Sequence, residues 1–136
     1  MMRRALCLAV VAVLSSGCGR ESRHDVRVSV EQISSISAEG ALMADDLSKG
    51  RTKTTFVRVH GQDLSDQAQH EAEKLNDAPV DPDLEDEVEK AITLAGDVGG
   101  AIDDMRTAPK DRAQARENEQ KLQQWAEQAR GLADSF

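Results

Sequence analysis

Carboxylates dominate the stretch of this 136-residue chain between residues 83 and 104. Lys90 is the main opposing charge, and the acids are expected on the outer face of a helix: Asp83, Glu85, Asp86, Glu87, Glu89, Asp97, Asp103 and Asp104. Such a cluster could bind a basic protein surface or hold Ca²⁺ loosely. The EF-hand pattern, with Asp at alternate positions, a central Gly and a closing Glu, is absent. Two readings remain, a docking site for a basic partner or a solvated face. The residues that we assign to the docking site are Glu85, Asp86, Glu89 and Asp97.

Two further side chains could bind a ligand, His60 and Trp125. His60 lies four residues from both Phe56 and Leu64, so it could act as a ligand or proton-transfer group inside a bundle. The alternative is a partly buried histidine bonded to a neighbouring helix. Trp125 could stack on a ligand, although a single Trp at a seam position is more often part of the core. Neither reading identifies a small molecule.

Metal and enzyme chemistry have little support in the sequence. No Glu lies three residues before His60 or His70, so the Glu-x-x-His pairs of helical metal sites are absent. The chain also lacks a Gly-x-Ser-x-Gly elbow, a glycine-rich phosphate loop after a strand and a His-Glu-x-x-His motif. A run of charges cannot by itself establish an oriented acid–base pair. We therefore expect no metal, no cofactor and no enzymatic activity.

Four amphipathic segments must position these side chains. The first, residues 29–48, has an apolar residue or Gly at spacings of three and four, with Ser29 and Gln32 resembling a capping box and Gly50 a stop signal. The second, residues 53–76, follows Thr52 as a candidate N-cap. The apolar face of the first is Val30, Ile33, Ile36, Gly40, Met43 and Leu47, and that of the second is Phe56, His60, Leu64, Ala68, Ala72 and Leu75.

The third segment, residues 82–106, has the most regular pattern in the chain. Pro79 and Pro82 end the preceding helix, and Asp81 is expected to cap the next one with Pro82 at its first position. Its apolar residues alternate steps of four and three over three heptads: Leu84, Val88, Ala91, Ala95, Val98, Ile102 and Met105.

The fourth segment, residues 110–133, follows Pro109, and its predicted face is Ala115, Leu122, Trp125, Ala129, Leu132 and Phe136. No single stripe is wide enough to be stable alone, but four together can bury one core. The pattern predicts an all-α domain, an antiparallel four-helix bundle over residues 29–136.

The N-terminus has the features of a secretory signal. Arg3 and Arg4 precede an apolar run of ten, Ala5–Leu14, which is too short for a membrane span of about 20 residues but suits a signal peptide. The next residues complete the sequence LSSGC, which ends at Cys18 and resembles the lipobox of bacterial lipoproteins. The resemblance implies that residues 1–17 are removed and that Cys18 carries a diacylglyceryl thioether. It covers the signal only, and we assign the mature domain to no family.

Residues 18–28 are charged and lack helical periodicity, so we expect them to form a lipidated tether. In Gram-negative lipoproteins, Asp directly after the lipidated cysteine tends to retain the protein at the inner membrane. Gly19 occupies that place here. By this resemblance the protein faces the periplasm from the outer membrane, if its host has one, and otherwise lies on the outer face of the cell membrane. Cys7 would leave with the signal, so the mature chain would hold no disulfide.

The formal net charge of −8 argues against binding to nucleic acid and against electrostatic adhesion to anionic membrane. We expect an envelope lipoprotein that is anchored in the membrane through Cys18 and acts as a structural or protein-interaction module with an envelope protein as partner. The alternative is a periplasmic inhibitor, of the immunity-protein type, that neutralises a secreted basic toxin or enzyme. A weaker third reading is a carrier of a small ligand at His60.

Overall fold

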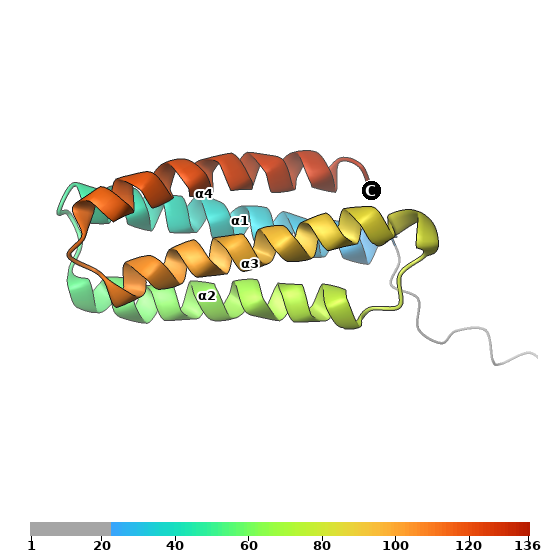
Figure 1. Ribbon diagram of the computed structural model, residues 1–136, viewed down its shortest axis with the longest axis horizontal. Coiled ribbons are helices and arrows are strands. Elements are labelled where there is room, and N and C mark those ends of the chain that lie inside the picture. Colours follow the sequence, from blue (N-terminus) through green and yellow to red (C-terminus); the bar gives the residue numbers. More distant parts are fainter. Residues whose placement is uncertain (1–22) are drawn as a thin grey trace, which may run out of the picture.

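The structure is a computed structural model that describes residues 23–136, and these residues form four α-helices and one short 3₁₀ helix, with no strand. The helices are α1 (Arg23–Ser48), α2 (Thr54–Asp77), α3 (Glu85–Thr107) and α4 (Arg112–Ala133), and the 3₁₀ helix η1 (Pro82–Leu84) leads into α3. The α1–α2 and α3–α4 turns lie at one end of the bundle, and the α2–α3 connection and the C-terminus lie at the other (Figure 1). The predicted antiparallel four-helix bundle is therefore confirmed.

The predicted signal peptide, the LSSGC sequence and Cys18 lie outside the described residues. Within residues 23–136, every helix is too short or too polar to cross a bilayer.

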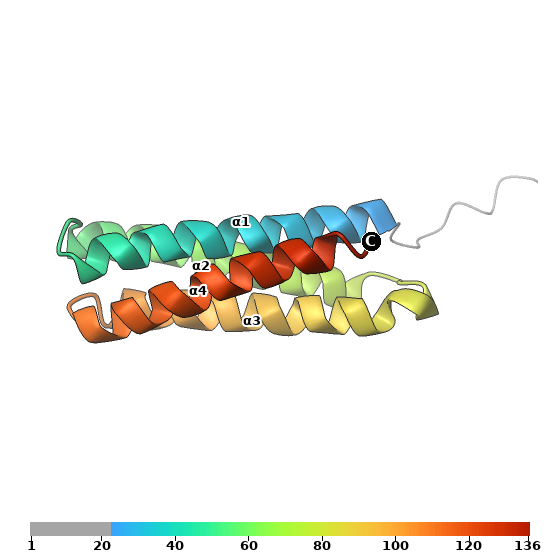
Figure 2. The same ribbon diagram turned by 90° about the horizontal axis from the view of Figure 1, so that it is seen from above.

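The bundle consists of two closely packed helix pairs, because α1 packs chiefly against α4 and α2 chiefly against α3. Figure 2 shows α4 inclined to α3. Small residues allow the backbones of α1 and α4 to approach each other, and two buried hydroxyl groups link them. Ser34 Oγ donates to the carbonyl oxygen of Ala126 at 2.8 Å, and Ser37 Oγ donates to that of Leu122 at 2.7 Å. Each hydroxyl is thus buried with a partner, which removes the cost of burying it alone.

The core contains every residue of the regular seam predicted for residues 82–106. Those seven side chains are at most 5% exposed, and Val98 and Ile102 are completely buried. All residues of the core cluster lie between Val26 and Ala133. The four helices of the described residues therefore share one core.

The start of α1 differs from its prediction. The helix begins at Arg23, not at Ser29, so residues 23–28 of the predicted tether are helical. Val26 is completely buried in the extra turns, which adds apolar burial that favours the longer helix. The predicted capping box is wrong, because Ser29 lies buried within α1 and its Oγ accepts a hydrogen bond from Lys74 Nζ at 2.9 Å.

The predicted apolar face of α2 is wrong in its first half. Phe56 is 52% exposed, whereas Val57 is completely buried and Gly61 is also buried. A Cβ at Gly61 would lie 3.3 Å from Arg106 Cβ, so α3 passes close to this part of α2. The space there suits Val57 and a glycine rather than a phenyl ring.

The helix ends agree with the sequence at two positions and differ at two. Gly50 stops α1 as predicted, with a φ of +67° that suits glycine and with Arg51 N donating to Asp46 O at 2.8 Å. Asp81 holds the predicted N-cap position, with Pro82 as the first residue of η1, although its side chain makes no capping hydrogen bond. The predicted cap Thr52 is wrong, because Lys53 holds the N-cap position of α2. Asp111 caps α4, which begins at Arg112 rather than at 110, by accepting from the backbone N of Ala113 and Gln114.

An ion-pair cluster reinforces the end of α1. Lys49 and Arg51 both contact the carboxylate of Asp45, and Arg51 Nε also donates to Asp46 Oδ1 at 2.9 Å. The hydrogen bond from Lys49 is the main reason that the pKa of Asp45 lies below its ordinary value. The same carboxylates raise the pKa of Arg51, chiefly through its hydrogen bond to Asp46.

Two glycines of α3 provide a test of this packing. No atom of a neighbouring element lies within 4 Å of the place that a Cβ would take at Gly96 or Gly100. Gly96→Ala and Gly100→Ala should each raise the free energy of unfolding by about 0.5–1 kcal/mol, because Ala has the higher helix propensity. Urea denaturation of residues 19–136 would measure the change.

Gly40→Ala is the matched control, because its Cβ would lie 3.0 Å from Ile102 Cδ1 and 3.3 Å from Leu122 Cδ1. Crowding there should cancel the gain in propensity. An equal gain at Gly40 and Gly96 would contradict the packing described for α1.

Candidate functional site

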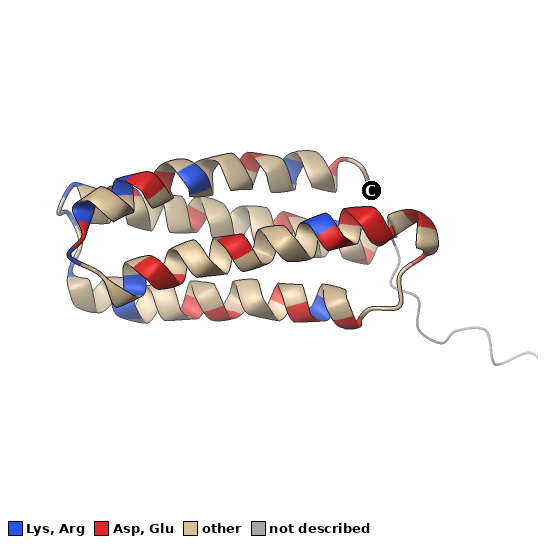
Figure 3. Cartoon of the chain, in the orientation of Figure 1, with Lys and Arg blue, Asp and Glu red and all other residues tan. Residues whose placement is uncertain are grey.

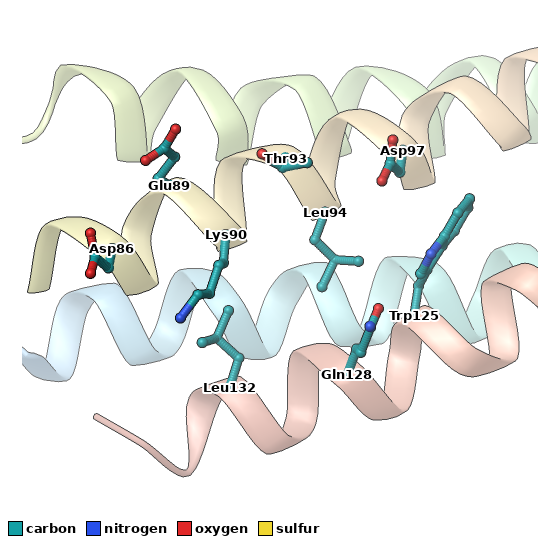
Figure 4. A pocket seen from close by; sticks show the side chains of 9 residues that line it. All are labelled: Asp86, Glu89, Lys90, Thr93, Leu94, Asp97, Trp125, Gln128 and Leu132. Carbon is teal, nitrogen blue, oxygen red and sulfur yellow. The ribbon is translucent and has the colours of Figure 1, made fainter.

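A groove of about 770 Å³ lies between α3 and α4, and its side chains come from both helices (Figure 4). It brings together three of the four acids assigned to a docking site with the single tryptophan. Glu85 is exposed but does not line the groove. The lining residues are Asp86, Glu89, Lys90, Thr93, Leu94 and Asp97 of α3, and Trp125, Gln128 and Leu132 of α4.

Helical spacing explains why these side chains share one surface. Asp86, Glu89, Thr93 and Asp97 recur at steps of three and four, which places them in a row along α3. At a rise of about 1.5 Å per residue, the row extends for about 16 Å. Trp125, Gln128 and Leu132 form a second row on α4 by the same spacing. The groove is therefore a trough that runs lengthwise between two antiparallel helices.

The trough follows from the way in which the helices pair. α3 approaches α2 closely at Gly99, where Ser65 Oγ donates to the Gly99 carbonyl oxygen at 3.4 Å. α4 is held against α1 by the serine hydroxyls described above. The hydrogen bond between α3 and α4 that lies nearest the groove joins Asn118 Nδ2 to Ala101 O at 3.1 Å, nearer the α3–α4 turn. Beyond that bond, α3 and α4 each pack more closely on another helix than on one another.

The floor of the groove is apolar. Leu94 is 8% exposed, and Trp125 and Leu132 are partly buried against the core cluster. Trp125 packs against the core, as its seam position predicts, and it also lines the groove. An exposed indole surface next to carboxylates can accept either an apolar side chain or a cation.

The rim is acidic, and its carboxylates have no partner among the residues that the structure describes. Asp86, Glu89 and Asp97 form no ion pair or hydrogen bond with another residue of the described range 23–136. Some carboxylates elsewhere are paired, as in Arg27–Glu31 at 2.8 Å and Lys121–Glu117 at 2.6 Å. Lys90 is the one cation of the lining. With three carboxylates and one ammonium group, the lining of the groove keeps a net negative charge.

Charge is distributed unevenly along the bundle. Lysines and arginines gather at the end that holds the α1–α2 and α3–α4 turns, and acids gather toward the α2–α3 connection (Figure 3). The groove residues Asp86 and Glu89 lie on the half of α3 nearest that connection. A cationic partner would thus be attracted to the groove end of the molecule.

His60 lies away from the groove, at the edge between α1 and α2. Its Nε2 is 3.0 Å from Glu39 Oε1 on α1, and its ring stacks on Phe56 with centroids 5.0 Å apart. This agrees with the reading of a partly buried histidine bonded to a neighbouring helix. Within the described residues, no group of three His, Cys, Asp or Glu side chains could hold a metal ion.

A second hollow of about 250 Å³ lies between α1 and α2. Its lining includes Asp63, Asp66 and His70. Asp63 and Asp66 each accept a hydrogen bond from a glutamine of the same helix, at 2.9 and 2.6 Å. These acids offer a natural control for the groove, because they carry the same charge but already have local partners.

Sequence reasoning did not assign five of the lining residues to a site: Lys90, Thr93, Leu94, Gln128 and Leu132. Leu94 carried a signal, since it is a large apolar residue one position before the seam residue Ala95. That signal places Leu94 at the margin of the core, but it does not show which helix faces it.

The chain was compared with family models, with curated proteins and with solved structures, and none of them matches it.

Proposed function

We propose that this protein is a lipid-anchored component of the bacterial cell envelope that docks with a partner protein through the α3–α4 groove. The observation that carries the proposal is a single groove lined by Asp86, Glu89 and Asp97 together with the partly buried Trp125. Unpaired carboxylates around an apolar floor suit a protein surface with basic and apolar side chains. The role is binding, and no catalytic group is assigned to the groove.

The sequence LSSGC supports the anchor at Cys18. Cys18 precedes Arg23, the first residue of α1, by five positions, and a chain of that length reaches at most about 18 Å. The groove residues of α3 lie toward the end of the bundle where α1 begins (Figure 1). The partner would therefore be met close to the membrane, which is the outer membrane if the host has one.

An inhibitor of a secreted basic enzyme or toxin is the second candidate, and the acidic groove favours it as well. The two functions differ in the partner. A structural module binds a resident envelope protein, whereas an inhibitor binds a secreted enzyme and abolishes its activity.

Photocrosslinking in living cells tests the docking function. The photoreactive residue p-benzoylphenylalanine would replace Gln128, which is exposed and lines the groove. The control carries it at Gln69, an exposed position of α2 outside the groove. We expect one dominant adduct from position 128, identified by mass spectrometry, and none of the same mass from position 69. The same pattern of adducts from both positions would refute a docking site in the groove.

A further inference from the structure

We propose that the occupant of the α3–α4 groove is a cationic amphipathic helix of the partner, laid lengthwise between the two helices. The inference rests on the proposed docking function and specifies the chemistry of the partner. The argument uses the shape of the groove, the positions of its charges and its apolar floor.

The shape favours a helix over a compact ligand. The two rows of lining residues are parallel to the helix axes, and the row on α3 extends for about 16 Å, or three helical turns. An amphipathic helix that lays its apolar face into a groove between two helices is a common mode of peptide recognition. It would add a fifth helix beside α3 and α4 without disturbing the core.

The charges define where the partner must be basic. Asp97 lies near Trp125 toward one end of the groove, and Asp86 lies at the other end with Glu89 one turn further in (Figure 4). If Lys or Arg residues are spaced three and four apart on the partner helix, their spacing along its axis equals that of the acids on α3. Lys90 disfavours an additional cation beside it, so the complementary pattern has basic residues toward both ends.

The floor defines where the partner must be apolar. Trp125 and Leu132 are only partly buried and offer apolar surface in the groove, with the nearly buried Leu94 between them and the core. A Leu, Met or Phe side chain at the middle of the partner helix would cover it. A central apolar anchor inside a charged rim is the usual arrangement of an energetically important contact.

Trp125 makes the inference directly measurable. It is the single tryptophan of the chain, which has no tyrosine, so the tryptophan fluorescence comes from the groove itself. Residues 19–136 contain the core cluster of the four helices and are used without the predicted signal sequence. The probe is a peptide of about 14 residues, long enough for about four helical turns. It contains Lys and Leu in the complementary pattern and no aromatic residue.

Titration should shift the emission of Trp125 to shorter wavelength and raise the helical circular dichroism of the peptide. The triple variant Asp86→Asn/Glu89→Gln/Asp97→Asn should raise the dissociation constant by about tenfold, because three rim charge pairs are lost. Glu73, like Asp63 and Asp66, accepts a hydrogen bond from a glutamine of α2, at 2.6 Å from Gln69 Nε2. The matched control Asp63→Asn/Asp66→Asn/Glu73→Gln removes the same charge from α2 and should leave the dissociation constant unchanged. Added salt should weaken binding to the wild type more than to the triple variant.

Besides an absence of binding, two kinds of result would overturn the inference. One is equal affinity for a peptide of the same composition in scrambled order, or equal weakening by both triple variants, since either would reveal attraction without a specific site. The other is a concentration-dependent shift of Trp125 without peptide and a dimeric mass in sedimentation, which would make a second copy the occupant. The first turns of α2, with exposed Phe56 and Val59 near Lys53, are the part of this chain that could then fill the groove.

The docking function can survive the loss of this inference. If the patterned peptide does not bind but position 128 still captures a protein in cells, the partner is not a cationic helix and docking stands. If both experiments fail, the docking function is refuted as well.

Discussion

Cys18→Ala is expected to abolish lipid attachment, so that the variant no longer carries the acylated N-terminal cysteine by which the wild type is held in the membrane fraction. Each buried methylene of an acyl chain contributes about 0.8 kcal/mol, and one chain alone anchors only marginally. A cysteine with two or three chains would hold the protein firmly. The effect should therefore be close to all-or-none.

Two readouts separate lipidation from retention by the apolar signal sequence. Mass spectrometry of the wild type should show an N-terminus at Cys18 that carries acyl chains, and fractionation should place it with membranes. Cys7→Ala is the matched control, because Cys7 lies within the predicted signal and would be removed with it. A wild-type N-terminus without acyl groups, or a Cys18→Ala protein that stays wholly with membranes at the mature mass, would contradict the anchor.

Val98→Asp is expected to lower the free energy of unfolding by about 3–5 kcal/mol, because it places an unpaired carboxyl group at a completely buried position. A domain of this size is ordinarily stable by about 5–15 kcal/mol, so the variant should melt at least about 10 °C lower or fail to fold. Thermal circular dichroism of residues 19–136 measures the change.

Thr93→Asp is the control for Val98→Asp, because it adds the same charge to the same helix at an exposed position. Its melting temperature should change little. Similar melting temperatures for the two variants would mean that Val98 does not lie in the core. The orientation of α3, which buries Val98 and leaves the acids exposed to solvent, would then be wrong.

The sequence predicted α3 best because its pattern is local. Leu84, Val98 and Met105 belong to a strict alternation of steps that only one face of a helix can satisfy. All the residues of that seam are buried. The stop at Gly50 was predictable for the same reason, since it depends on one residue and its immediate neighbours.

The predictions failed where distant residues decide the structure. Phe56, Val57 and Val59 are all apolar, and the sequence does not say which of them faces the core. The approach of Arg106 to Gly61 decides it, and those residues are 45 positions apart. The start of α1 was missed because Val26 is the one buried apolar residue among residues 23–28. A single apolar residue that packs into the core makes no helical pattern in the sequence.

The groove could be predicted only in parts. The acids of residues 83–104 and the single Trp were each recognisable as candidates. The acids and Trp125 line the same groove because α3 and α4 are neighbours, and because each of them packs more closely on another helix than on the other. That arrangement follows from glycine, alanine and serine contacts between helices, such as those at Gly99 and Ser37, which have no signature in a single segment.

The most direct test of the central claim combines the photoreactive residue at position 128 with neutralisation of the groove acids in the living cell. The account predicts that Asp86→Asn/Glu89→Gln/Asp97→Asn abolishes the dominant adduct at unchanged protein level, while Asp63→Asn/Asp66→Asn/Glu73→Gln preserves it. An adduct of undiminished yield in the groove variant would show that these carboxylates do not bind the partner, and it would contradict the assignment of the α3–α4 groove as the docking site.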